Sequence, residues 1–314
     1  MADMKQLRTF ILVAEMGSLS RVSDRLRLAQ PALSRQIKLL EDSVGFELFT
    51  RSGRGMQLTE HGTALLERVS GLVKQLEDSL EDVRSMSVVP TGQVVLGCIP
   101  SASYMVAGRI AIRVAQELPE VSLRIVEGYA GHLVNWLHRG EVDLALLYGP
   151  ASDLHLRVSD VMFEELVLVS PAGEAPGVPE IEVRDLAGMN LVLPSRPHGL
   201  RMVVEGAASK VGITLKVKYQ ADSFRVLKEI VAAGLGHTVL PLSAFYREQQ
   251  EGLYRITRLS RPRVIRHLVM ALPTNRGDTR ATDAVRALAM DEIEKMVASG
   301  AWRTIPNRDD PQKP

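Results

Sequence analysis

Apolar residues recur at helical spacing along residues 29–45, AQPALSRQIKLLEDSVG. Steps of four, three and four positions place one apolar stripe on this helix: Leu33, Ile37, Leu40 and Val44. The opposite face carries long or hydrogen-bonding side chains. Pro31 suits the first helical position, where a missing N–H loses no hydrogen bond, so Gln30 is expected at the cap. The pattern predicts a helix that buries one face and presents a polar face to a partner.

Two helices are predicted before this segment and a hairpin after it. Gly17 ends the first helix, whose inward positions are Met4, Leu7, Phe10, Ile11 and Ala14. Ser20 is expected to cap the second helix, in which Val22 and Leu26 lie four residues apart. Residues 46–59, FELFTRSGRGMQLT, alternate apolar and polar side chains around a glycine-containing turn, which is typical of a two-stranded wing. Residues 1–58 are therefore predicted to form one winged, mainly helical domain.

A long helix is predicted over residues 59–89. Its apolar stripe follows steps of three or four residues: Gly62, Leu65, Val69, Leu72, Leu76, Leu80 and Val83. Such a stripe suits either a helix lying on its own domain or the seam of a coiled coil. The narrow stripe, and the absence of Gly and Pro between Leu72 and Val89, favour a seam with a second copy. We expect five residues to form it: Leu65, Val69, Leu72, Leu76 and Leu80.

From residue 93 short β-rich runs alternate with helical patterns. Runs such as VVLGCIP, VDLALLY and HTVLPL are separated by helical stretches at residues 104–118, 132–139, 200–211 and 223–233. This alternation predicts a mostly parallel sheet with covered faces. Residues 90–300 are long enough for two lobes, and residues 301–314 are expected to be a disordered tail.

Composition narrows the class of protein. The single cysteine, Cys98, excludes an internal disulfide and lies in an apolar run, so a buried thiol is favoured over a redox sensor. No early apolar run is long enough for a signal sequence or a membrane span, so we expect a cytoplasmic protein without a membrane partner. The net charge is +1, but residues 1–58 are mildly basic and residues 59–88 acidic, a weak indication of nucleic-acid contact.

Catalytic and metal-binding patterns are not found. The seven histidines form no pair at metal-ligand spacing, and no cysteine partners them. Gly234-Leu235-Gly236 lacks the third glycine of a dinucleotide motif, and no nucleophile elbow or phosphate loop occurs. An enzyme or a solute-binding protein built on the α/β part remains an alternative, but the catalytic constellation or export signal that each needs is missing. We expect no enzyme, no catalytic or metal-binding residue and no cofactor.

The first three helices and the wing together match a winged helix-turn-helix, with the helix-turn-helix at about residues 21–40. The second helix of such a motif lies in the major groove, where six residues would meet DNA: Gln30, Pro31, Ala32, Ser34, Arg35 and Lys38. Arg51 and Arg54 on the wing would contact the backbone or the minor groove. Taken alone, the polar face of this helix could equally be an ordinary solvated surface. The combination of that helix with a wing and a dimerising helix favours DNA binding.

Residues 10–62, FILVAEMGSLSRVSDRLRLAQPALSRQIKLLEDSVGFELFTRSGRGMQLTEHG, strongly resemble the N-terminal signature of the LysR-type transcriptional regulators. The resemblance extends over the whole chain. GMNLVLPSRPHGLR and GLGHTVLP are similar to the branch around the nitrogen assimilation control regulators. Val22-Ser23 is a departure, because the family usually places two alanines there.

The resemblance implies a winged helix-turn-helix, a long linker helix and a two-lobed α/β domain like that of periplasmic binding proteins. It also implies a homodimer, commonly a homotetramer, that binds and bends inverted-repeat promoter DNA in response to a small metabolite. RNA polymerase is a candidate partner. A twofold dimer displays two such helices and therefore suits a near-palindrome.

The resemblance also places an effector site by position: Ser101, Ser103, Ala130, Gly131, Tyr148, Gly149, Ser195, Arg196 and His198. Hydroxyls, helix N-termini and Arg196 suit a small carboxylate or similar anion. Two alternatives stay open. The serines can simply cap a helix while Arg196 is solvated, and the protein can be an architectural DNA binder that ignores metabolites.

Overall fold

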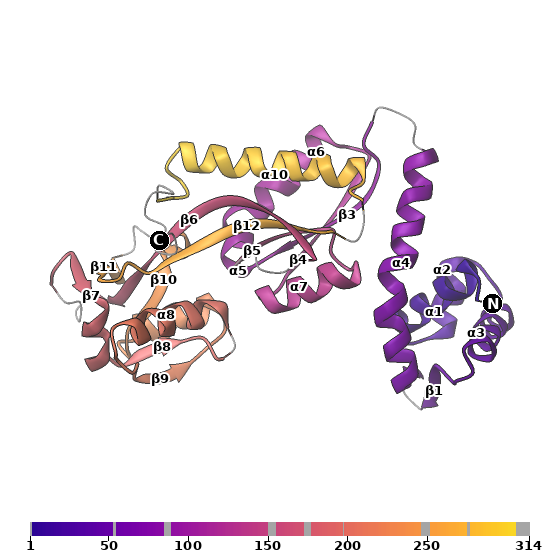
Figure 1. The fold of residues 1–314 in the computed structure, drawn as a ribbon, viewed down its shortest axis with the longest axis horizontal. Coiled ribbons are helices and arrows are strands. Elements are labelled where there is room, and N and C mark those ends of the chain that lie inside the picture. The colour runs from indigo at the N-terminus through magenta and orange to yellow at the C-terminus, as the bar shows by residue number, and fades with distance from the viewer. Residues whose placement is uncertain are drawn as a thin grey trace. The chain divides into compact units, whose positions relative to one another are not determined.

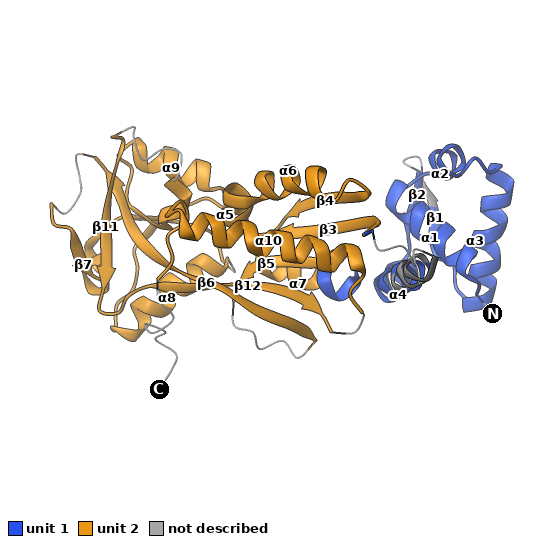
Figure 2. Ribbon diagram, turned by 90° about the horizontal axis from the view of Figure 1, so that it is seen from above, with its two compact units in different colours: residues 1–89, 136–141 blue, residues 90–135, 142–314 orange. Residues whose placement is uncertain are grey.

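A computed structural model describes residues 2–52, 55–84, 89–149, 155–172, 177–196, 198–245, 252–274 and 277–305. The chain divides into two compact units (Figure 2). The first comprises residues 1–89 and 136–141, and the second residues 90–135 and 142–314.

The first unit begins with three helices, α1 (Met4–Met16), α2 (Leu19–Leu26) and α3 (Gln30–Val44), followed by the hairpin of β1 (Phe49–Ser52) and β2 (Gly55–Leu58). Gly17 ends α1 in a left-handed conformation, as predicted. Two predicted caps are wrong. Ser18 caps α2 in place of Ser20, and Ala29 precedes α3, so that Gln30 is already helical.

The three helices and the hairpin enclose one apolar core: Phe10, Val13, Leu19, Val22, Leu33, Ile37, Leu40, Leu48 and Phe49. A close backbone contact joins the wing to the first turn, where the Met56 N–H donates to the Gly17 carbonyl at 2.9 Å. Gly55 makes this contact possible, because a Cβ there would lie 2.5 Å from the same oxygen.

The long helix α4 spans Glu60–Arg84. Thr59 caps it, since its hydroxyl accepts the Gly62 N–H at 2.9 Å. Gly62 does not belong to a seam as predicted. It faces the wing, where a Cβ would clash with the Leu48 carbonyl.

The second unit is built on an eight-stranded sheet of order β4-β3-β5-β12-β6-β11-β7, with β10 alongside β6. Its strands are β3 (Gly92–Cys98), β4 (Val121–Glu127), β5 (Leu144–Tyr148), β6 (Leu156–Pro171), β7 (Glu180–Glu182), β10 (Thr238–Pro241), β11 (Tyr254–Ser260) and β12 (Ile265–Pro273). The prediction of a mostly parallel sheet is wrong. β3 is parallel to β4 and β5, but β12 is antiparallel to β5 and β6.

The sheet is mixed because β6 and β12 run between two lobes. The first lobe holds β3, β4, β5 and the neighbouring parts of β6 and β12. The second holds the end of β6, β7, β10, β11 and a small parallel sheet of β8 (Leu191–Leu193) and β9 (Val217–Gln220). Buried residues from Leu166 to Val264 form the core of this second lobe.

Helices cover both lobes. The first lobe carries α5 (Pro100–Ala102), a π-helical segment (Ser103–Ala107), α6 (Gly108–Glu117), α7 (Ala130–Arg139) and α10 (Arg280–Ala298). The second carries α8 (Gly199–Lys210), α9 (Phe224–Ala232) and 3₁₀ turns at Val183–Gly188 and Leu242–Phe245. In Figure 1, α6 and α10 lie along one face of the sheet and α7 on the other.

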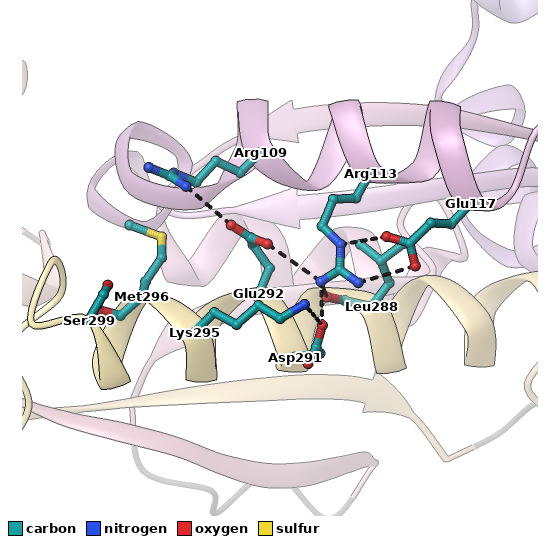
Figure 3. A network of polar contacts seen from close by, with 9 residues as sticks. All are labelled: Arg109, Arg113, Glu117, Leu288, Asp291, Glu292, Lys295, Met296 and Ser299. Atoms are coloured by element: carbon teal, nitrogen blue, oxygen red, sulfur yellow. Dashed lines mark hydrogen bonds and ion pairs between the residues drawn. The ribbon is translucent and has the colours of Figure 1, made fainter.

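A charged cluster fastens α10 to α6 (Figure 3). The Arg113 guanidinium donates to Glu117 on its own helix and to Asp291 and Glu292 on α10. The hydrogen bonds to Glu117 and Asp291 hold the pKa of Arg113 above its ordinary value. Lys295 also donates to Asp291, at 2.7 Å.

The predicted disorder of residues 301–314 is wrong for the residues that directly follow α10. Residues 301–305 are ordered against the sheet rather than disordered, because Trp302 is fully buried and the Ile305 N–H donates to the Phe163 carbonyl at 3.0 Å. Residues 306–314 lie outside the described residues.

Candidate DNA interface and effector cavity

Helix α3 separates its side chains as its sequence predicts. Leu33, Ile37 and Leu40 are at most 4% exposed and pack into the core of the first unit. The predicted DNA-facing residues lie on the other side: Gln30, Pro31, Ala32, Arg35 and Lys38 are exposed, and Ser34 is half-buried. A rigid scaffold therefore presents a polar helical face that carries two cations.

The turn before α3 has a specific anchor. The Ser23 hydroxyl donates to the Leu28 carbonyl at 2.6 Å, and Arg27 between them takes a left-handed conformation that closes α2. Val22 is fully buried. Both residues that depart from the family signature thus have a structural use, and the hydroxyl of Ser23 ties down the turn that orients α3.

The wing is only partly described. Arg51 lies on β1 opposite Met56, and Arg54 lies outside the described residues. Their contact with DNA stays a prediction.

The predicted dimer seam divides into two halves. Leu65 and Val69 pack against the core of their own unit. Leu72, Leu76 and Leu80 are exposed by 63%, 46% and 49%, which is a row of large apolar side chains along one helix. These three leucines are the exposed part of the predicted seam, where a second copy is expected to pack.

A cavity of about 330 Å³ lies between the two lobes of the second unit. Five predicted effector residues line it: Ser101, Ala130, Tyr148, Gly149 and His198. The other polar lining residues were not predicted: Tyr129, Arg266 and His267. The remaining walls are apolar apart from Gly199: Ile99, Pro100, Phe163, Leu200, Met202, Val203, Phe224 and Ile265.

Four predicted effector residues do not line this cavity: Ser103, Gly131, Ser195 and Arg196. The Ser195 hydroxyl and N–H both donate to the Asp222 carboxylate, at 2.7 and 2.8 Å. The expectation that Arg196 supplies the cation of the site is wrong, because its guanidinium is 71% exposed and pairs with Glu205 at 2.9 Å.

A buried polar network centred on Glu164 lies behind the floor of the cavity; its members Ser101, Tyr148 and Arg266 line the cavity, and Glu164 and Trp302 do not. Arg266 donates to Glu164 Oε2 at 2.6 Å and to the Ser101 hydroxyl at 3.1 Å. The Tyr148 hydroxyl donates to the same carboxylate oxygen at 2.6 Å, and Trp302 Nε1 donates to the other oxygen at 3.1 Å. Burial is the main reason that the pKa of Tyr148 lies well above its ordinary value.

His198 and Tyr129 close one side of the cavity. The Leu200 N–H donates to His198 Nδ1 at 3.1 Å, which caps α8 and leaves the proton of the neutral ring on Nε2. Burial lowers the pKa of His198. The Tyr129 ring packs edge-on against His198 and its hydroxyl donates to the Asp222 carbonyl at 2.8 Å, a hydrogen bond that joins the two lobes.

Sequence reasoning missed Glu164, Arg266 and Trp302, although a signal for the first two exists. Each occupies an inward position of a strand, Glu164 between buried Met162 and Leu166, and Arg266 two residues before buried Leu268. A charge at an inward position is rare unless it is paired.

Two family matches cover most of the chain. Residues 4–63 match the bacterial regulatory helix-turn-helix protein, lysR family, and residues 88–294 match the LysR substrate binding domain. The HTH-type transcriptional regulator BbuR of Bordetella bronchiseptica is 30% identical over 304 residues, covering 96% of this chain and 93% of BbuR. The nitrogen assimilation regulatory protein nac of Escherichia coli is 28% identical over 296 residues, 94% of this chain and 96% of that protein.

The fold is likewise shared with solved structures. A full-length OxyR variant from Pseudomonas aeruginosa has a TM-score of 0.76 at 20% identity and covers 99% of each chain. CbnR complexed with its target DNA has a TM-score of 0.67 at 18% identity, covering 93% of this chain and 99% of CbnR.

The chain belongs to the LysR family of transcriptional regulators. It is a DNA-binding regulator with a winged helix-turn-helix and a two-lobed effector-binding domain like that of periplasmic binding proteins, and its relatives are named as regulators rather than enzymes. Within the described ranges, no helix is both long and apolar enough to cross a bilayer. The same residues contain no group of three or more His, Cys, Asp and Glu placed to hold a metal ion.

Proposed function

We propose that this regulator binds inverted-repeat promoter DNA as a homodimer, or as a tetramer made of two dimers, and that a small molecule in the cavity changes its effect on transcription. One observation carries the effector part. The cavity lies between two lobes that share the crossing strands β6 and β12, so a ligand that touches both lobes favours one lobe geometry.

The DNA-binding part is supported by the exposed polar face of α3. Arg35 can bridge two acceptors of guanine in the major groove, while Lys38 and Ser34 suit phosphates. A dimer joined through Leu72, Leu76 and Leu80 presents two such helices. We expect the protein in the cytoplasm with its promoter DNA, where RNA polymerase is a candidate partner.

A small anion was expected from the sequence because of hydroxyls, helix N-termini and Arg196; Ser101 and Ala130 line the cavity, but Arg196 does not. Arg266 does line it, but its guanidinium already holds Glu164.

The effector proposal is tested with a promoter reporter measured across a panel of metabolites. Met202 lines the cavity yet is 60% exposed, so Met202→Trp can fill the cavity with little strain, and Met202→Leu is its control. We expect a metabolite response in the native chain and in Met202→Leu that is lost in Met202→Trp, with DNA binding kept in all three. An unchanged response in Met202→Trp would place the effector elsewhere. No response to any metabolite would favour the ligand-independent architectural binder.

A further inference from the structure

The walls of the cavity are apolar and partly aromatic. Phe163 lies on β6, Phe224 begins α9, and Leu200 and Val203 face the cavity from α8. Apolar walls favour a ligand with a large apolar body, since each square ångström of apolar surface removed from water contributes about 25 cal/mol.

The charges around this cavity are already compensated within the protein. Arg266 is 4% exposed and Glu164 is 2% exposed, and their ion pair is supplemented by the Tyr148 and Trp302 donors. His267 stacks on Phe163, and its Nε2 lies 3.1 Å from the exposed Asp160 carboxylate but makes no hydrogen bond within the described residues. His198 uses its Nδ1 lone pair to cap α8, an interaction that its protonated form would lose.

A charged ligand would have to break this compensation. An anion that recruited Arg266 would leave Glu164 buried without its counter-ion, and a cation that recruited Glu164 would do the same to Arg266. Leaving one member of a buried pair alone is strongly unfavourable.

We propose that the effector of this regulator is an uncharged molecule with a largely apolar, ring-sized body. The inference rests on the proposed effector function of the cavity and specifies its ligand class. The Glu164–Arg266 pair acts as a neutral floor that selects against ions of either sign.

The test measures binding of three probes of matched shape to the full-length protein at pH 7 by calorimetry: benzyl alcohol, benzoate and benzylamine, which is cationic at this pH. Benzyl alcohol is expected to bind at least about tenfold more tightly than either ion, and Met202→Trp should abolish its binding. Tightest binding of benzoate or benzylamine would overturn the inference, as would the absence of binding by any probe.

Substitution of Glu164 tests whether the Glu164–Arg266 pair is the reason for the preference for an uncharged ligand. Glu164→Gln leaves Arg266 without a carboxylate, so the preference should change from benzyl alcohol to benzoate. The double variant Glu164→Gln with Arg266→Gln should restore the preference for benzyl alcohol, and Glu165→Gln, one position along β6, should leave it unaltered. An unchanged preference in Glu164→Gln would contradict the proposed floor. The native probe series decides the ligand class even where a variant fails to fold.

Failure of this inference is distinguishable from failure of the proposed function. If benzoate binds most tightly and alters DNA binding in a gel shift, the cavity is an effector site but its ligand is not uncharged. If the protein binds DNA but no probe or metabolite alters that binding, both the effector function and the uncharged ligand class are rejected.

Discussion

Arg266 and Glu164 are direct cross-strand partners on β12 and β6, and their side chains form a buried ion pair of 2.6 Å. The two strands connect the lobes, so this pair lies where the lobes, the cavity and the C-terminal Trp302 meet.

Breaking the pair should strongly destabilise the effector domain. Arg266→Gln removes one member and leaves Glu164 buried, for which a loss of about 3–5 kcal/mol in the free energy of unfolding is expected. Denaturant unfolding of the full-length protein measures it. Arg263→Gln is the matched control on a neighbouring residue, since Arg263 is 48% exposed and lies 3.9 Å from Glu165, and it should cost at most about 1 kcal/mol. Equal losses in the free energy of unfolding for the two substitutions would show that the buried pair stabilises the domain no more than the exposed one.

Arg35→Ala should weaken DNA binding and relax the preference at one base pair in each half-site. The loss of a bidentate contact to guanine is worth about 1–3 kcal/mol. Fluorescence anisotropy with a labelled operator measures this change. Arg225→Ala, on the exposed face of α9, removes a guanidinium from the effector domain and should leave DNA affinity unchanged. Native affinity in Arg35→Ala would mean that α3 does not contact the bases.

Leu72→Asp combined with Leu76→Asp should dissociate the dimer. Each leucine buried in a seam contributes roughly 1.5–3 kcal/mol, and a charge there adds a further penalty. Light scattering should show monomers. Thr63→Asp places the same charge at an exposed position of the same helix and should leave the dimer intact. A persistent dimer in the double variant would move the main interface away from α4.

The stability of the native chain should fall between neutral and mildly acidic pH, in part through His198. Burial lowers the pKa of His198 from its ordinary value of 6.5, with Arg266 lowering it further and Asp222 opposing the shift. The unfolded chain therefore takes up this proton first. The stability that neutral His198 contributes is complete above the unfolded pKa and is lost as the pH falls through the folded one.

His198→Asn tests this dependence, because asparagine can cap α8 but does not titrate in this range. The decrease in melting temperature from neutral pH to pH 5 should be smaller in His198→Asn than in the native chain. His132→Asn is the matched substitution at an exposed histidine, with which the His198→Asn result is compared. If the melting temperature of both variants depends on pH as that of the native chain does, His198 does not cause the loss of stability.

The sequence predicted those parts of the fold that local periodicity controls. The faces of α3 followed from Leu33, Ile37 and Leu40, and the end of α1 followed from Gly17. The caps of α2 and α3 were misplaced because Ser18 and Ser20 are equally good candidates in sequence, and because Ala29 has no capping side chain. The mixed sheet was missed because β12 carries Arg266 and His267 within its apolar pattern.

The candidate site was harder to predict because it depends on which charges meet in space. Arg196 lies in the expected loop, but Glu205 lies on the same surface and neutralises it. Glu164 and Arg266 are about a hundred residues apart in the chain, and only the register of β6 and β12 brings them together. The predicted tail, residues 301–314, included Trp302, which the structure buries completely.

We propose that this protein binds DNA through two symmetry-related copies of α3. Enrichment of a random-sequence DNA library by the full-length protein tests it without knowledge of the operator. We predict that the enriched sequences contain an interrupted inverted repeat whose half-sites are separated by about one helical turn, ~10 base pairs, or a multiple of it. Sequences without twofold symmetry, or no enrichment above the starting library, would overturn this mode of DNA binding.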